Sequence, residues 1–137
     1  MAPSRAKEAS LSKLSVISVV DDDASVRAAM NNLLRSRGYV VHTFGSAEEF
    51  LGSPQLNDTS CVIADVQMSA MNGLELLVNI RMRGYAAPYI VVTAFPDESV
   101  RARALQAGAS CFLAKPCTAP NLIACLDAAL AADGTTA

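Results

Sequence analysis

A single carboxylate, Asp65, ends a short apolar run formed by residues 61–64, and the turn-forming pair Asn72-Gly73 follows it. A buried strand that ends in one acid displays a reactive side chain at the edge of a sheet. Three more acids, Asp21-Asp22-Asp23, end a second apolar run, residues 16–20. These two clusters are the first candidates for a functional site.

A hydroxyl and an amine end two later apolar runs in the same way. Thr93 closes residues 89–93, and Lys115 follows residues 111–114. Lys115 is the only lysine after Lys13. The segment from Asp21 to Asp65 is long enough for about two strand–helix units. The segments from Asp65 to Thr93 and from Thr93 to Lys115 are each long enough for about one unit. All four points can therefore lie on one edge of a parallel sheet.

Carboxylates gathered at such an edge repel one another. At an effective dielectric constant near 20, two charges about 4 Å apart interact with about 4 kcal/mol, so one acid would take up a proton unless a cation is present. Oxygen ligands of this kind suit Mg²⁺, which accepts one or two carboxylates and keeps several waters. The sequence therefore predicts a Mg²⁺ site that includes Asp21, Asp22 and Asp65.

An aspartate beside a lysine, a hydroxyl and Mg²⁺ can also accept a phosphoryl group. Aspartate forms acyl phosphates as covalent intermediates. Lys115 and the cation would neutralise the phosphoryl oxygens, and the Thr93 hydroxyl would donate a hydrogen bond. The alternative is that Lys115 forms an ion pair with an acid and that this pair only stabilises the fold.

Apolar periodicity predicts five strands that alternate with five helices. The predicted strands are 16–20, 39–44, 61–64, 89–93 and 111–114. The predicted helices are 24–37, a short helix through 50 and 51, 73–83, a fourth helix that Pro96-Asp97-Glu98 opens and that ends near Gly108, and a last helix that runs from its cap, Thr118, to about Ala132. Asp23 and Thr118 can cap helices, Ser46 to Glu49 has the form of a capping box, and Gly38 suits a helix end. Residues 52–59 are predicted to be a polar loop.

This alternation predicts an α/β fold with a doubly wound parallel sheet covered on both faces. We expect one folded domain, residues 15–132, between flexible tails 1–14 and 133–137. Residues 1–14 lack the apolar segment of a secretory signal, and no apolar run reaches the roughly 18 residues that span a bilayer. A cytoplasmic location without membrane contact is expected.

The net charge of −2 argues against a direct nucleic-acid binder, which needs clustered basic residues. No glycine-rich loop follows the first strand, which argues against a nucleotide or flavin site. The four cysteines, Cys61, Cys111, Cys117 and Cys125, match no zinc pattern. We expect reduced thiols, with Cys61 and Cys111 as small buried residues of strands; a redox role is the alternative.

Four blocks in order resemble the receiver domain of bacterial two-component response regulators. They are VVDDDASVR, IADVQMSAMNGLELL, VVTAFPD and GASCFLAKP, and the resemblance covers about residues 16–132. It implies a flavodoxin-like sheet with strand order 2-1-3-4-5 and five helices. It also implies a phosphoacceptor signalling module rather than an enzyme, with only self-phosphorylation and autodephosphorylation chemistry.

The resemblance assigns roles to individual residues. Asp65 would accept the phosphoryl group, with Lys115 and Thr93 binding it. Asp22 would hold Mg²⁺ directly and Asp21 largely through water, and the backbone carbonyl of Gln67 would complete the protein ligands. A further implied pair, Thr93 and Phe112, would act as the switch, the hydroxyl moving to the phosphate and the ring following inward. The Lys115-Pro116 bond would be cis.

Two positions depart from the family pattern, and a third bears on the lifetime of the phosphoryl group. Ser69 stands where most relatives have proline, so we expect a less rigid loop after Asp65. Cys117 replaces a frequent phenylalanine after the Lys-Pro pair. Phe95, two residues after Thr93, occupies a position that tends to tune phosphoryl loss, and its bulk is expected to restrict the attacking water.

The implied partners are a histidine kinase or phosphotransfer protein and a downstream protein of unknown identity, with a phosphorylation-dependent homodimer as a further option. The signalling surface would be the fourth helix, fifth strand and fifth helix. We expect a stand-alone regulator without a DNA-binding output domain. The alternatives are the receiver part of a DNA-binding transcriptional regulator and an Asp-nucleophile phosphatase, which usually has a second acid where this chain has Gln67.

Overall fold

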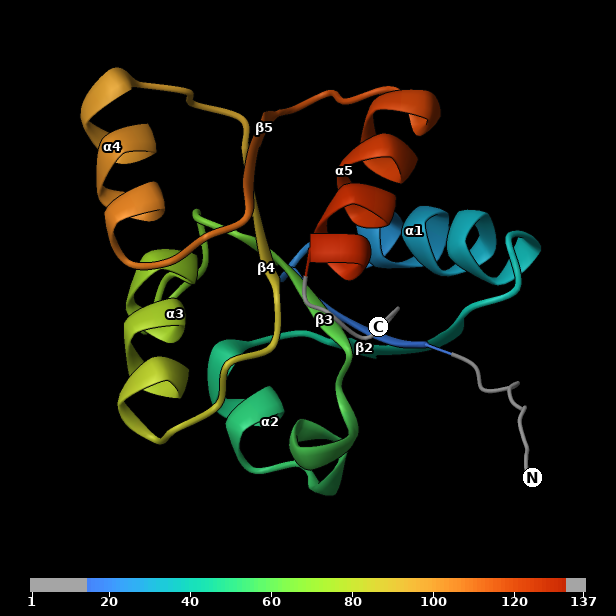
Figure 1. Cartoon of the computed structure of the whole chain (residues 1–137), viewed down its shortest axis with the longest axis horizontal. Coiled ribbons are helices and arrows are strands. Elements are labelled where there is room, and N and C mark those ends of the chain that lie inside the picture. Colours follow the sequence, from blue (N-terminus) through green and yellow to red (C-terminus); the bar gives the residue numbers. More distant parts are fainter. Residues whose placement is uncertain (1–14, 133–137) are drawn as a thin grey trace.

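The computed structural model describes residues 15–132, and the predicted tails 1–14 and 133–137 lie outside this range (Figure 1). The strands are β1 (Val16–Val20), β2 (Val40–Phe44), β3 (Cys61–Asp65), β4 (Tyr89–Thr93) and β5 (Cys111–Ala114). The helices are α1 (Ala24–Ser36), α2 (Ala47–Leu51), the 3-10 helix η1 (Pro54–Asp58), α3 (Gly73–Met82), α4 (Glu98–Gln106) and α5 (Ala119–Ala132). The five predicted strands and five predicted α-helices are therefore present.

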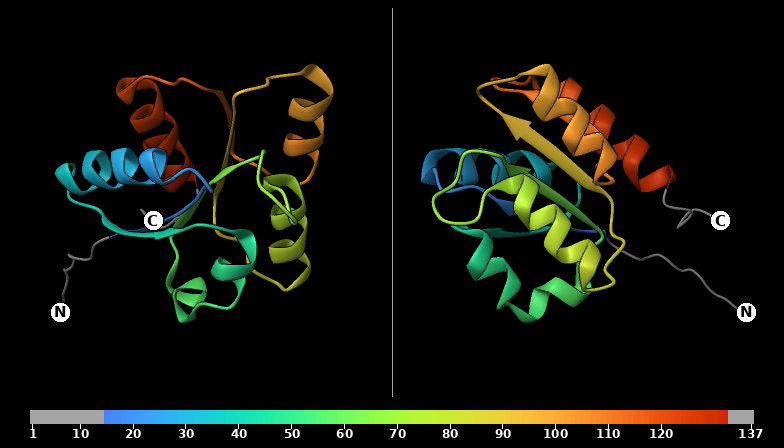
Figure 2. Two further views of the ribbon diagram at one scale, coloured as in Figure 1. Left: turned by 180° about the vertical axis from the view of Figure 1, so that it is seen from behind. Right: turned by 90° about the vertical axis from the view of Figure 1, so that its left-hand side faces the viewer.

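The strands form one parallel sheet in the order β2-β1-β3-β4-β5, which confirms the predicted topology. Helices α1 and α5 cover one face, and α2, α3 and α4 cover the other (Figures 1 and 2). All residues of β3 and β4 are buried, as their unbroken apolar runs predict. Each face has its own hydrophobic cluster, so the sheet is the middle of three layers.

The helix starts follow the capping residues with one difference. The Asp23 carboxylate accepts hydrogen bonds from the backbone N–H groups of Ser25 and Val26. The Ser46 hydroxyl accepts from the Glu49 N–H, but the Glu49 carboxylate accepts from the Gly45 N–H. The predicted box at α2 is therefore only half formed, because its second bond is shifted by one residue.

Several predicted boundaries differ by a few residues from those of the structure, and two of the differences have clear local reasons. Residues 52–59 hold the 3-10 helix η1, because Ser53 caps it, Pro54 begins it and Leu56 is buried against the core. Strand β2 begins at Val40 rather than Tyr39, because the Tyr39 N–H donates to the Leu34 carbonyl at the end of α1.

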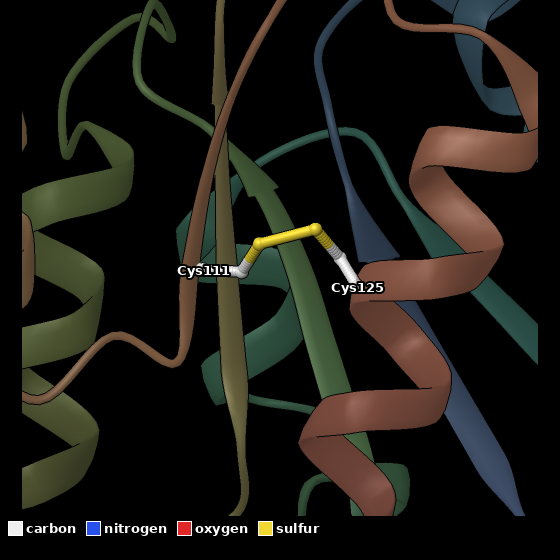
Figure 3. The surroundings of a disulfide bond; sticks show 2 residues. All are labelled: Cys111 and Cys125. Carbon is white, nitrogen blue, oxygen red and sulfur yellow. A yellow bond between two sulfur atoms is a disulfide. The ribbon is translucent and has the colours of Figure 1, made fainter.

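The prediction of four reduced thiols was also wrong for two of them. Cys111 in β5 and Cys125 in α5 form a disulfide, with their Cα atoms 6.3 Å apart (Figure 3). Helix α5 crosses the face of the sheet beside β5, and this tertiary packing brings the two cysteines together. Cys117 is a free thiol, and Cys61 is buried as predicted.

A hydrogen bond from Tyr39 to Asp127 links the α1–β2 connection to α5. The phenol donates to the carboxylate over 3.0 Å. Partial burial and the Asp127 charge raise the pKa of Tyr39 from 10.0 to about 12. The neutral phenol is therefore the form that the folded state prefers.

Tyr39→Phe is expected to lower the free energy of unfolding by about 0.5–1 kcal/mol, because it removes a partly exposed hydrogen bond. A raised pKa contributes stability below the ordinary pKa, and this contribution is lost as the pH rises toward about 12. Urea unfolding should show a constant difference between wild type and variant up to pH 10, and a shrinking one above it. A difference that grows above pH 10 would contradict this coupling.

Candidate functional site

The carboxyl ends of the strands bring the predicted residues to one edge of the sheet. Asp21 and Asp22 follow β1, Asp65 is the last residue of β3, Thr93 ends β4 and Lys115 follows β5. Backbone bonds fix two of these ends: the Lys115 N–H donates to the Thr93 carbonyl, and the Asp21 N–H donates to the Phe44 carbonyl. The site lies between β1 and β3, where the order in which the strands are added to the sheet reverses. Functional sites of doubly wound sheets usually lie at this point.

Lys115 bridges the two buried carboxylates. Its Nζ lies 2.9 Å from the Asp21 Oδ2 and 3.4 Å from the Asp65 Oδ2. Asp21 and Asp65 are only 2% and 5% exposed, whereas Asp22 and Asp23 are exposed. One ammonium therefore faces two buried negative charges, and the local charge is not balanced.

The pKa values of Asp65 and Lys115 respond to this imbalance. Burial raises the pKa of Asp65, the Asp21 charge raises it further, and Lys115 only partly opposes the rise. For Lys115, burial disfavours the ammonium, but the hydrogen bond and charge of Asp21, with the Asp65 charge, give a raised pKa overall. The ammonium is retained and the Asp65 carboxylate lacks sufficient positive charge around it.

The carboxylates fit a hard divalent cation. One oxygen from each of Asp21, Asp22 and Asp65 lies within 4.8 Å of the others. The Asp65 Oδ1 is buried and has no hydrogen-bond partner among the described residues. Oxygen donors with an uncompensated negative charge and an exposed member that leaves room for water match the preferences of Mg²⁺. The cluster can therefore hold a metal ion.

Thr93 makes contacts that the sequence did not reveal. Its hydroxyl donates to the Gln67 side-chain Oε1 over 2.8 Å and accepts from the Phe95 N–H over 3.0 Å. Sequence reasoning considered only the backbone carbonyl of Gln67, and that role stays a prediction. The amide of Gln67 holds the hydroxyl beside the loop that follows Asp65.

Phe112 lies on the same sheet face as Thr93. Val91 pairs with Phe112 and Thr93 pairs with Ala114, and residues two apart on a strand share a face. Phe112 is partly buried against the cluster beneath α3 and α4. Its predicted switch role stays a prediction, although the register places it one side-chain row from Thr93.

Gly73 lies against the candidate site in a way that the sequence did not reveal, because Asn72-Gly73 predicts only a turn before a helix. Asn72 and Glu75 form a complete capping box at α3, and Gly73 is the first helical residue. A Cβ on Gly73 would overlap the Asp65 carbonyl group. The buried Tyr89 hydroxyl also donates to the Gly73 carbonyl over 2.7 Å. Helix α3 therefore starts in direct contact with the backbone of Asp65.

The loop between β3 and α3 is anchored from α2. The Met71 N–H donates to the Glu48 carboxylate over 3.2 Å. Ala70 has a φ of 59°, a conformation that residues other than glycine rarely adopt. Ser69 is exposed beside it, and the greater mobility expected from the missing proline stays a prediction.

Comparisons with known proteins give one consistent family. The model of the response regulator receiver domain matches residues 17–127. The chain is 39% identical to the transcriptional regulatory protein TdiR of Thauera aromatica, over 85% of this chain and 52% of that protein. It is 38% identical to nodulation protein W of Bradyrhizobium diazoefficiens, over 85% of this chain and 50% of that protein. The chain therefore spans about half the length of these curated relatives.

The fold also matches that of a solved structure. The chemotaxis protein CheY4 of Vibrio cholerae superposes with a TM-score of 0.80 at 27% identity, covering 86% of this chain and all of that one. Among residues 15–132, no helix is long and apolar enough to cross a membrane. The matched family model, the sheet order and the acidic edge agree, and the chain belongs to the response regulator receiver domain family.

Proposed function

We propose that this receiver domain accepts a phosphoryl group on Asp65 from a histidine kinase or a phosphotransfer protein. The observation that carries the proposal is the state of the Asp65 carboxylate. It is buried, one oxygen faces Lys115 at 3.4 Å, and the other has no partner among the described residues. Such a carboxylate is held in place for a further ligand and lies beside a cation that can bind the added phosphate.

In this proposal, Asp21, Asp22, Asp65 and the backbone carbonyl of Gln67 hold Mg²⁺. The bound cation would neutralise carboxylate and phosphoryl charge. The acidic cluster and its uncompensated charge support this assignment. Asp22 supplies the exposed oxygen, and the buried Asp21 keeps its bond with Lys115.

The transfer forms one bond and breaks one. An Asp65 carboxylate oxygen attacks the phosphorus of phosphohistidine, the P–N bond breaks, and the imidazole leaves with the electron pair and takes a proton. Lys115 then binds a phosphoryl oxygen in place of part of its contact with Asp65. The charge-assisted bond opposes return of the group to the donor.

The switch step would follow from the new acceptor oxygens. The Thr93 hydroxyl leaves the Gln67 amide and donates to the phosphoryl group. Phe112, on the same face of the sheet, moves into the space beside Thr93. This changes the surface formed by α4, β5 and α5, which binds the downstream protein.

Incubation with acetyl phosphate and Mg²⁺ tests the proposal. Intact-mass analysis should show one added phosphoryl group, with none when EDTA replaces Mg²⁺. Sustained hydrolysis of a small phosphate ester without a stable adduct would instead support the phosphatase. The exposed Gln67 amide cannot serve as the general acid that such an enzyme needs.

Phe95→Ala is expected to shorten the phosphoryl half-life several-fold. Phe95 is 70% exposed in the loop after Thr93, and its N–H donates to the Thr93 hydroxyl. We expect the ring to restrict the approach of water to Asp65, and the backbone contact with Thr93 survives the substitution. The measurement is loss of the phosphorylated mass after the donor is removed, with Leu105→Ala as an exposed apolar control. An unchanged half-life would exclude a shielding role for Phe95.

A second candidate differs only in the output. The relative TdiR carries the name transcriptional regulatory protein and is matched over 52% of its length, which favours the receiver part of a DNA-binding regulator. The stand-alone regulator, with cytoplasmic location and protein partners, is the first candidate. An immunoblot of cell extract with an antibody against this chain distinguishes the two candidates. A band near 14.3 kDa supports the stand-alone regulator, and a band of about twice that mass supports the receiver part of a longer regulator.

A further inference from the structure

The Cys111–Cys125 disulfide joins two elements of the proposed signalling surface. Cys111 is the first residue of β5, the edge strand of the sheet, and Cys125 lies midway along α5 (Figure 3). Their Cα separation of 6.3 Å is within the range that a disulfide spans. Both residues are partly exposed, so a small thiol or a reductant can reach the pair.

Neighbouring side chains of β5 pack on opposite faces of the sheet. Cys111 packs with the cluster beneath α1 and α5, whereas Phe112, the next residue, packs against the opposite cluster beneath α3 and α4. Three residues further, the strand delivers Lys115 to Asp21 and Asp65. A bond that fixes Cys111 to α5 therefore restricts the short strand that also carries the predicted switch ring.

The disulfide is present together with one arrangement of Thr93. The Thr93 hydroxyl donates to the side-chain oxygen of Gln67 in the same structure in which Cys111 and Cys125 are joined. A covalent cross-link favours the arrangement in which its own geometry is satisfied. We propose that Cys111 and Cys125 are a redox-responsive pair whose disulfide holds β5 against α5 and opposes the phosphorylated arrangement. This inference rests on the proposed phosphoacceptor function.

The chemistry of the pair is balanced with ordinary cellular reagents. Oxidation joins the two thiols and releases two electrons and two protons to a low-molecular-weight disulfide, which becomes two thiols. In reduction, the thiolate of a dithiol attacks one cysteine sulfur and forms a mixed disulfide, and the other cysteine sulfur leaves as a thiolate. The second thiol of the reductant then attacks the mixed disulfide, so that the reductant becomes a cyclic disulfide and the first cysteine sulfur leaves as a thiolate. In a reducing compartment disulfides are transient and regulatory, which fits a conditional bond at this surface better than a permanent one.

Linkage makes the effect reciprocal. If the disulfide weakens phosphate binding by a given factor, occupation of the phosphate site makes the disulfide easier to reduce by the same factor. Coupling between two sites in one protein is commonly at least about fivefold. The redox state of Cys111 and Cys125 would then set how strongly the receiver responds to its kinase.

The test compares the affinity of the oxidised and reduced chain for beryllofluoride with Mg²⁺, a phosphoryl mimic, by amide NMR titration. Oxidised glutathione or a dithiol sets the redox state. Alkylation of the unfolded protein and intact mass then count the thiols, with two of the four cysteines expected to be protected after oxidation. We expect about fivefold weaker binding by the oxidised chain.

Two variants separate the causes. Cys125→Ser should bind the mimic like the reduced wild type in both buffers, while Cys117→Ser, which removes a thiol outside the disulfide, should keep the difference. Four alkylated cysteines after oxidation, or equal affinities in both redox states, would overturn the inference and leave the proposed function intact. Failure of the wild type to bind the mimic in either state would overturn the proposed function and the inference with it.

Discussion

Asp65→Asn is expected to reduce labelling by acetyl phosphate to background. The amide keeps the size and shape of the carboxyl group, but it lacks the anionic oxygen that attacks phosphorus. It also removes one of the three acids that can hold the cation. Intact-mass analysis of wild type and variant, at equal donor and Mg²⁺ concentrations, measures the loss.

The variant should remain folded, so that the loss can be assigned to chemistry. Burial and the Asp21 charge raise the pKa of Asp65, and a neutral amide avoids both the desolvation and the repulsion. Asp58→Asn is the matched control, because Asp58 is an exposed acid in η1 away from the cluster. Asp58→Asn should label like wild type. Labelling of folded Asp65→Asn at the wild-type level would exclude Asp65 as the acceptor.

Gly73→Ala is expected to cost about 1–3 kcal/mol of unfolding free energy, the range for overpacking a closely packed site. The added Cβ would meet the backbone carbonyl carbon of Asp65 at 2.9 Å and the Cα of Val66 at 3.2 Å. Neither backbone atom can move without shifting the end of β3 or the start of α3. Urea unfolding measures the stability loss, and slower phosphoryl labelling should accompany it.

Gly52→Ala separates this contact from the general cost of replacing glycine. Gly52 caps the C-terminal end of α2 with a φ of −87°, and its added Cβ would come no closer than 3.5 Å to a neighbouring atom, the Glu48 carbonyl oxygen. Alanine fits that conformation, so the control should change stability by less than about 1 kcal/mol. Equal effects of the two substitutions would show that the approach of α3 to Asp65 is not tight.

The fold was predictable because its strands are short apolar runs that alternate with helical patterns, and four of these runs end at a polar residue. The strands are mostly apolar, without alternating polar residues, which required a sheet covered on both faces. Strands and helices follow one another in turn along the chain, which required parallel strands. Once the strands are parallel, the residues that follow them share an edge. The meeting of Asp21, Asp65 and Lys115 therefore follows from the order of the elements, without knowledge of any side-chain contact.

The missed features depend on tertiary packing. The Cys111–Cys125 pair forms only because α5 crosses the sheet beside β5, and sequence spacing carries no information on that approach. The bond from Thr93 to the Gln67 amide depends on the path of an irregular loop. The role of Gly73 had a local signal, a glycine directly after the cap Asn72, but the collision partner lies in another element.

Trapping the phosphorylated residue tests the central claim most directly. Borohydride reduces an aspartyl phosphate to homoserine, and mass spectrometry of the digested chain then locates the change. We predict homoserine at position 65 after treatment with acetyl phosphate and Mg²⁺, and none when the donor is omitted. Homoserine or a stable phosphate at any other residue, with Asp65 unmodified, would contradict the assignment of Asp65 as the phosphoacceptor.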